Sequence, residues 1–129
     1  MLRPWQSITI DQISIKGVPA YSPDDIHYPV EAGGLGFVIA LKFYDIYYAG
    51  DTLRIPEMGL IKPDIAILPI DGNGKLTVDE AVEVVKEMRP RWVLPSNWGG
   101  TEGASRFDAQ TFKKTAEEYT EVVLLTQTL

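Results

Sequence analysis

The segment Asp64-Ile65-Ala66-Ile67-Leu68-Pro69-Ile70 decides the fold, together with the stretch that follows it. Its nearly unbroken apolar character predicts a central strand covered on both faces. Thr77-Val78-Asp79-Glu80 then matches a capping box, and residues 78–88 follow the three-and-four spacing of an amphipathic helix. A short strand is predicted at 92–95. Strand, helix and strand in this order indicate an α/β or α+β layered domain.

On the amino-terminal side of this unit, the sequence predicts a hairpin or two short strands, followed by two adjacent strands joined by a tight turn. Residues 7–21 place isoleucines at alternate positions on either side of a polar Asp11-Gln12 corner. The segments 37–41 and 44–49 are rich in β-branched and aromatic residues, and the tight turn Lys42-Phe43 separates them. The first part of the chain is therefore expected to be rich in strands.

A second helix and a last strand are predicted on the carboxy-terminal side. The helical stripe consists of Ala109, Phe112, Ala116 and Tyr119, and the strand covers 121–125. Residues 56–60 have room for one helical turn at most. Because 129 residues without repeat or linker fit one core, we expect a single domain over 1–129, with two main helices.

Composition excludes several classes of protein. Hydrophobic residues make up 45% and charged residues 23%, which is typical of a soluble globular chain, and no apolar run approaches the roughly 20 residues of a membrane span. The net charge of -6 argues against nucleic acid or an anionic membrane as partner. With no cysteine, the chain has neither a disulfide framework nor a thiolate metal site.

Two weaker expectations concern the source and location of the protein. The first residues lack the charged region, apolar core and cleavage site of a secretory signal, so we expect a cytoplasmic protein. Two asparagines, four glutamines and no cysteine are a small set of heat-labile residues, which suggests a thermophilic source.

Asp51 is the first candidate functional residue. It follows a hydrophobic strand directly, after Gly50, whose freedom of φ permits a sharp turn that presents the carboxylate at the strand end. That position suits an oxygen ligand of a divalent metal or a general base. It equally suits an Asx turn or a helix cap, and the residues alone leave both interpretations open.

His27 is the second candidate and the only histidine. It lies in the segment 22–36, which is rich in Pro, Gly and acidic residues and long enough to favour a functional loop. Histidine suits metal binding and general-base chemistry, although a loop histidine is often merely exposed. The nearby Asp24, Asp25 and Glu31 are explained more simply by a solvated acidic loop.

The other loops carry weaker signals. Residues 71–74, Asp-Gly-Asn-Gly, have the composition of a turn, and the segment after Pro95 offers the Asn97 amide to line a pocket. The patterns of a phosphate-binding glycine loop and of a nucleophile elbow do not occur. If the strands share a sheet, the loops at Asp51, Asp71 and Asn97 gather at one edge, where α/β folds usually keep their chemistry.

Several of these segments in order resemble the carboxy-terminal half of a metallo-β-lactamase-fold hydrolase. The branch that the chain resembles most is that of the L-ascorbate-6-phosphate lactonase-like proteins, over about Ile10 to Phe112. The matching segments are Val18-Pro19-Ala20-Tyr21, His27, Gly34-Leu35-Gly36-Phe37-Val38-Ile39, Ile46-Tyr47-Tyr48-Ala49-Gly50-Asp51-Thr52, Ile55-Pro56-Glu57-Met58, Asp64-Ile65-Ala66-Ile67-Leu68-Pro69-Ile70, Ala81 and Pro95-Ser96-Asn97-Trp98-Gly99.

This resemblance implies a four-layer αββα sandwich, of which the chain would form half around a mixed sheet. It assigns to Asp51 the bridging of two metal ions, and His27 could match a histidine that precedes the Gly-x-Gly-Phe segment. The implied metal is zinc, manganese or iron. In such sites the metal lowers the pKa of bound water, which becomes the nucleophile.

Two departures from the family pattern set the functional prediction. The His-x-His-x-Asp-His segment is absent, and Asn97 stands where the family has its final histidine. Asp51 and His27 are too few for a zinc site, which takes at least three protein ligands. The resemblance therefore indicates a truncated or split hydrolase, inactive alone, and leaves open whether the chain is itself an enzyme. The alternative is a non-catalytic interaction module that kept the fold and lost the site.

A partner is expected for a packing reason. The sheet face that meets the other half in the family would be exposed here, and apolar patches of several hundred Å² are rarely left bare. We expect either a homodimer or a separately encoded amino-terminal half to cover it. The substrate, a small molecule, is not identified by the sequence.

Overall fold

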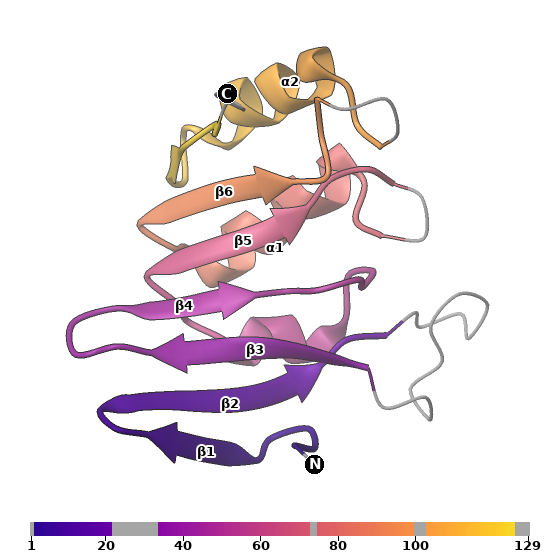
Figure 1. Ribbon diagram of the computed structural model, residues 1–129. Helices are drawn as coiled ribbons and strands as arrows, with labels where there is room; N and C mark the ends of the chain where they lie inside the picture. Colours follow the sequence, from indigo (N-terminus) through magenta and orange to yellow (C-terminus); the bar gives the residue numbers. More distant parts are fainter. Residues whose placement is uncertain (1, 22–33, 73–74, 100–102, 126–129) are drawn as a thin grey trace.

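A mixed seven-stranded sheet organises the computed structural model (Figure 1), which describes residues 2–21, 34–72, 75–99 and 103–125. The strands lie side by side in the order in which they occur along the chain. They are β1 (Ser7–Ile10), β2 (Ile13–Pro19), β3 (Leu35–Ala40), β4 (Asp45–Tyr48), β5 (Ile65–Pro69), β6 (Trp92–Ser96) and β7 (Glu121–Val122).

The sheet changes from antiparallel to parallel at β4. β1 to β4 pair antiparallel, which shows a hairpin of β1 with β2 and confirms the predicted hairpin of β3 with β4. β4 to β7 pair parallel, which requires crossover connections. These contain the 3₁₀ helix η2 (Pro56–Leu60) and the α-helices α1 (Val78–Met88) and α2 (Arg106–Ala116).

All the described helical elements lie on one side of the sheet. Figure 1 looks onto the opposite side, with η2 and α1 fainter behind the strands, and α2 packs against α1. A row of fully or nearly fully buried side chains runs across the helix side through Tyr47, Ala66, Val93 and Val122. The core therefore lies between the sheet and the helices, in two layers.

The other side of the sheet is called the bare face here, because no helix among the described residues covers it. Its side chains alternate with those of the core, as the two-residue period of a strand requires. The apolar residues of the bare face include Ile8, Ile10, Ile13, Ile15, Phe37, Ile39, Ile46, Tyr48, Ile65, Ile67, Trp92 and Leu94.

The prediction that the 64–70 strand is covered on both faces is wrong for the part of the chain that the structure describes. Ala66 and Leu68 of β5 are fully buried against the helices, whereas Ile65 and Ile67 on the bare face are only half-buried. A strand with one covered face needs apolar side chains only at alternate positions, but this strand has them at the positions between as well. The side chains on its bare face are therefore of the kind found in a protein interior.

Two further differences concern the carboxy-terminal elements. α2 ends at Ala116, and Tyr119, predicted on its stripe, lies beyond it, where Lys86 and Arg89 approach its ring at 5.4 and 5.9 Å. β7 has only two residues instead of the predicted five. None of the described helices is long and apolar enough to span a membrane.

Candidate functional site

The strand ends at one edge of the sheet bring the predicted loops together. β4, β5 and β6 run parallel, so their carboxyl ends share an edge, and Asp51, Asp71 and Asn97 follow these three ends in turn. The predicted gathering of the three loops is confirmed. The same edge is the place where α/β folds usually bind ligands.

The turn before Asp51 depends on glycine. Gly50 has a φ of +70°, and a Cβ there would lie 3.1 Å from the carbonyl oxygen of Leu35. The chain therefore turns sharply against β3 and leaves Asp51 exposed. Its carboxylate makes no hydrogen bond or ion pair with any residue that the structure describes. Neither the Asx turn nor the helix cap is found within those residues.

Thr52, next to Asp51, holds this strand end in place. It is the only polar side chain that is fully buried among the described residues. Its hydroxyl donates to the backbone oxygen of Tyr21 at 3.0 Å and accepts from the Tyr21 amide at 3.1 Å. The Tyr21 hydroxyl in turn lies 3.0 and 2.9 Å from the two carboxylate oxygens of Glu57. Asp51 thus stands next to a residue that is hydrogen-bonded to Tyr21, whose hydroxyl is bonded to Glu57.

This Thr52, Tyr21 and Glu57 network was not predicted from the sequence. Its members are 31 and 36 residues apart along the chain, so no local spacing reveals them. The signal that could have found them is the polar Thr52 directly after an apolar strand, because a buried hydroxyl requires partners.

Asp71 and Asn97 are neighbours at the same edge. A Cβ on Gly103 would meet the Asn97 carbonyl oxygen at 2.7 Å and Asp71 Cβ at 3.3 Å, so only glycine fits between them. Asp71 forms an ion pair with Lys75 at 3.6 Å, and both side chains are largely buried. Asn97 has a φ of +62° and is exposed. The positive charge of the Lys75 ammonium beside Asp71 would repel a metal cation at this carboxylate.

The described residues do not fit a metal ion by themselves. They contain no group of three or more His, Asp or Glu side chains that could hold one. Asp51 is a single carboxylate, Asp71 is paired with a cation, and an amide such as that of Asn97 is not among the ligands of ordinary zinc sites. His27, with Asp24, Asp25 and Glu31, lies outside the described residues.

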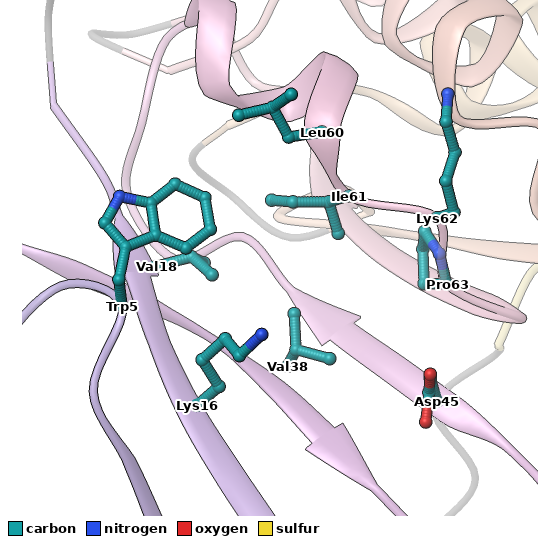
Figure 2. Close-up of a pocket in the computed structure, with 9 residues that line it drawn as sticks. All are labelled: Trp5, Lys16, Val18, Val38, Asp45, Leu60, Ile61, Lys62 and Pro63. Atoms are coloured by element: carbon teal, nitrogen blue, oxygen red, sulfur yellow. The ribbon is translucent and has the colours of Figure 1, made fainter.

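A separate cavity of about 160 Å³ lies on the helix side of the sheet. Figure 2 shows the Lys16 side chain extending between Trp5 and Val38, two of the residues that line the cavity. The Lys62 ammonium at its rim instead donates to the Glu87 carbonyl oxygen at 2.6 Å. Asp45, at the opposite end of β4 from Asp51, also lines it, so the cavity is not part of the strand-end site.

Comparison with known proteins matches residues 1–97 to the β-lactamase superfamily domain. The chain belongs to the metallo-β-lactamase superfamily. It is 34% identical over 122 residues to a UPF0173 metal-dependent hydrolase of Pyrococcus furiosus, which covers 90% of this chain and 53% of that protein. A relative from Staphylothermus marinus is 41% identical over 96 residues, covering 70% of this chain and 42% of its own length.

Two solved structures share this fold. A metal-dependent hydrolase from Parabacteroides distasonis superposes with a TM-score of 0.82 at 26% identity, over 96% of this chain and 56% of that one. Igni18, a metallo hydrolase of the hyperthermophilic archaeon Ignicoccus hospitalis, gives 0.78 at 24% identity, covering 95% of this chain and 55% of that one. The chain therefore spans about half the length of the relatives it matches.

Proposed function

We propose that this chain is the carboxy-terminal half of a metal-dependent hydrolase and that it is inactive alone, needing a partner or self-association. The observation that carries the proposal is a mismatch. Relatives over 90% of the chain are metal-dependent hydrolases of about twice the matched length, yet the described residues hold no ligand cluster. A competent site would then need groups from outside the described residues.

The role proposed for Asp51 is that of one oxygen ligand of zinc, manganese or iron. Two observations support this role. The Asp51 carboxylate is exposed and has no partner among the described residues, and the neighbouring Thr52 is held by hydrogen bonds to Tyr21. His27 is proposed as a second ligand. Two ligands are fewer than the three protein ligands of an ordinary zinc site, so no catalytic step is derived for this chain alone.

The L-ascorbate-6-phosphate lactonase-like branch is part of the proposal. It rests on the succession of segments from Val18 to Gly99. It implies a small-molecule substrate with a hydrolysable bond, because the relatives that the chain matches are metal-dependent hydrolases. Fold alone does not narrow the substrate further.

Native mass spectrometry of protein purified without chelator, with hydrolysis assays, tests this proposal. The probes are a p-nitrophenyl ester, a γ-lactone and bis(p-nitrophenyl) phosphate, each with added zinc, manganese or iron. We expect the chain alone to carry no stoichiometric metal and to show no turnover. Robust metal-dependent turnover that Asp51→Ala abolishes and Asp45→Ala preserves would overturn it, because Asp45 lies at the other end of the same strand.

The second candidate is a non-catalytic interaction module, favoured by the exposed Asn97 at the position of the family's final histidine. It differs from the first in one outcome. A module gives no hydrolysis even after the missing part of the fold is supplied, whereas a split enzyme gains metal-dependent turnover that Asp51→Ala removes.

A further inference from the structure

The cavity on the helix side of the sheet is built by parts of the chain that lie far apart in sequence. Its volume is about 160 Å³. Trp5 precedes β1, Val18 and Val38 come from β2 and β3, and Ile61 follows η2. Val18 is fully buried and Ile61 is 5% exposed. Because an apolar cavity of about 150 Å³ can hold a benzene-sized molecule, this one has room for one ring.

Trp5 is held beside this cavity by backbone contacts. Its φ of +66° lies in the left-handed region, which a bulky residue rarely adopts and which often marks a ligand site. The Trp5 amide donates to the Gly17 carbonyl oxygen at 2.6 Å, and the Gly17 amide donates to that of Gln6 at 2.9 Å. Figure 2 shows the six-membered ring of Trp5 on the side of Val18 and Ile61, with the indole nitrogen turned away from them. The ring is thus in place before any ligand binds.

Two large apolar side chains of the lining remain in contact with water. Trp5 is 46% exposed and Leu60 is 74% exposed. A ligand with an apolar body would cover part of both side chains, and removing apolar surface from water is favourable. The lining therefore favours a ligand that carries an aromatic ring or a branched hydrocarbon group.

Lys16 adds a positive charge to this apolar lining. It is the only charged member of the helix-side row that the pairing register aligns across the sheet, which consists of Ser7, Lys16, Val38, Tyr47, Ala66, Val93 and Val122. Figure 2 shows the Lys16 side chain extending between Trp5 and Val38. Its ammonium group makes no hydrogen bond or ion pair with any residue that the structure describes. An anionic group of a ligand can therefore bind there without displacing a partner.

The other charged residues of the lining give the ligand a direction. The Lys62 ammonium donates to the Glu87 carbonyl oxygen at 2.6 Å, and Figure 2 shows it pointing away from Lys16. Asp45 lies on the far side of Val38 from Lys16 in the same view. A carboxylate is attracted at the Lys16 end and repelled at the Asp45 end.

We propose that this cavity binds a small carboxylate with an aromatic or branched apolar body. The body lies against Trp5, Val18 and Ile61, and the carboxylate pairs with the Lys16 ammonium. The site is separate from the strand-end site, because Asp45 and Asp51 lie at opposite ends of β4. The inference therefore does not depend on the hydrolase proposal.

Titration of ¹⁵N-labelled protein with benzoate, followed by NMR, tests the proposal. The signals to follow are the indole N–H of Trp5 and the backbone amides of Lys16 and Val38. We expect saturable shifts with a dissociation constant on the order of 1 mM, which is ordinary for a ligand of about nine non-hydrogen atoms. Acetate has the charge without the ring, benzyl alcohol has the ring without the charge, and benzylamine has the opposite charge. Each should bind at least about tenfold more weakly than benzoate.

Three variants separate the contribution of the charge from that of the cavity. Lys16→Met keeps the length of the side chain and removes its charge, so it should weaken benzoate binding at least about tenfold and leave benzyl alcohol binding unchanged. Trp5→Ala removes the ring and should weaken the binding of both. Lys114→Met is the matched control, since Lys114 is exposed on α2 and does not line the cavity. The dispersion of each NMR spectrum verifies that the variant is folded.

Several outcomes would overturn the proposal. Equal binding of benzoate and benzyl alcohol would mean that Lys16 takes no part in recognition. Benzoate that leaves the signals of Trp5 and Lys16 in place, or that shifts only residues of the strand-end site such as Thr52 and Asn97, would exclude binding in this cavity. None of these readouts involves hydrolysis, so they hold whatever becomes of the proposed function.

Discussion

Two tyrosine hydroxyls show how burial and hydrogen bonding act on single residues. Tyr47 is fully buried in β4, and burial raises the pKa of its hydroxyl well above the ordinary value of 10.0. That hydroxyl has no hydrogen-bond partner among the described residues. The Tyr21 hydroxyl, in contrast, is bonded to the Glu57 carboxylate. The unpaired Tyr47 hydroxyl is therefore expected to destabilise the fold, whereas the hydrogen-bonded Tyr21 hydroxyl is expected to stabilise it.

Removing each hydroxyl should therefore change stability in opposite directions. We expect Tyr47→Phe to raise the free energy of unfolding by about 1 kcal/mol, because a buried unpaired hydroxyl is desolvated without compensation. We expect Tyr21→Phe to lower it by about 1–2 kcal/mol, because it leaves Glu57 without this donor. Urea denaturation of the two variants checks the signs. A loss of stability in Tyr47→Phe would contradict the first prediction.

At the scale of elements, both α-helices begin with a complete capping box. Thr77 and Glu80 exchange side-chain and backbone hydrogen bonds at the start of α1, as Ser105 and Asp108 do at the start of α2. The first box was predicted from its Thr-x-x-Glu spacing. The second was missed, because Asp at the third position is a weaker signal than Glu or Gln.

The α2 cap should make stability depend on acid. Hydrogen bonds from the Ser105 backbone amide, and then from its hydroxyl, hold the pKa of Asp108 below the ordinary value of 3.8. A carboxylate whose pKa is lower in the folded state stabilises the fold at any pH above its unfolded-state pKa. That stabilisation is lost as the pH falls through its folded-state pKa. We expect Asp108→Asn to be less stable than wild type at pH 6, with the difference shrinking below pH 3.8. Thermal unfolding across this pH range checks it, and a constant difference would contradict the prediction.

At the scale of the molecule, the sheet is unevenly supported. The parallel centre, β4 to β6, has its helix side covered by η2 and α1, whereas all four residues of the edge strand β1 are exposed. Elements with few buried contacts open at lower free energy than the core. In addition, no described helix covers the side of each strand that belongs to the bare face.

Amide hydrogen exchange should report this unevenness. We expect the β1 amides to exchange at least about tenfold faster than those of β5, which corresponds to about 1.4 kcal/mol of opening free energy. Mass spectrometry of peptic peptides from the two strands measures the ratio. Equal protection of β1 and β5 in the protein alone would contradict the expectation.

The sequence by itself determined the order of strands and helices, the first capping box and the position of Asp51 at a strand end. These features follow from local periods, turns and spacings, which act within a few residues. Only the tertiary structure decided how Thr52 is bonded to Tyr21, 31 residues away, and how Asp71 comes to lie beside Gly103, 32 residues further along the chain. It also showed that one face of the apolar strand at 64–70 is uncovered, since an apolar pattern records what a face is built to contact and not whether the contact is present.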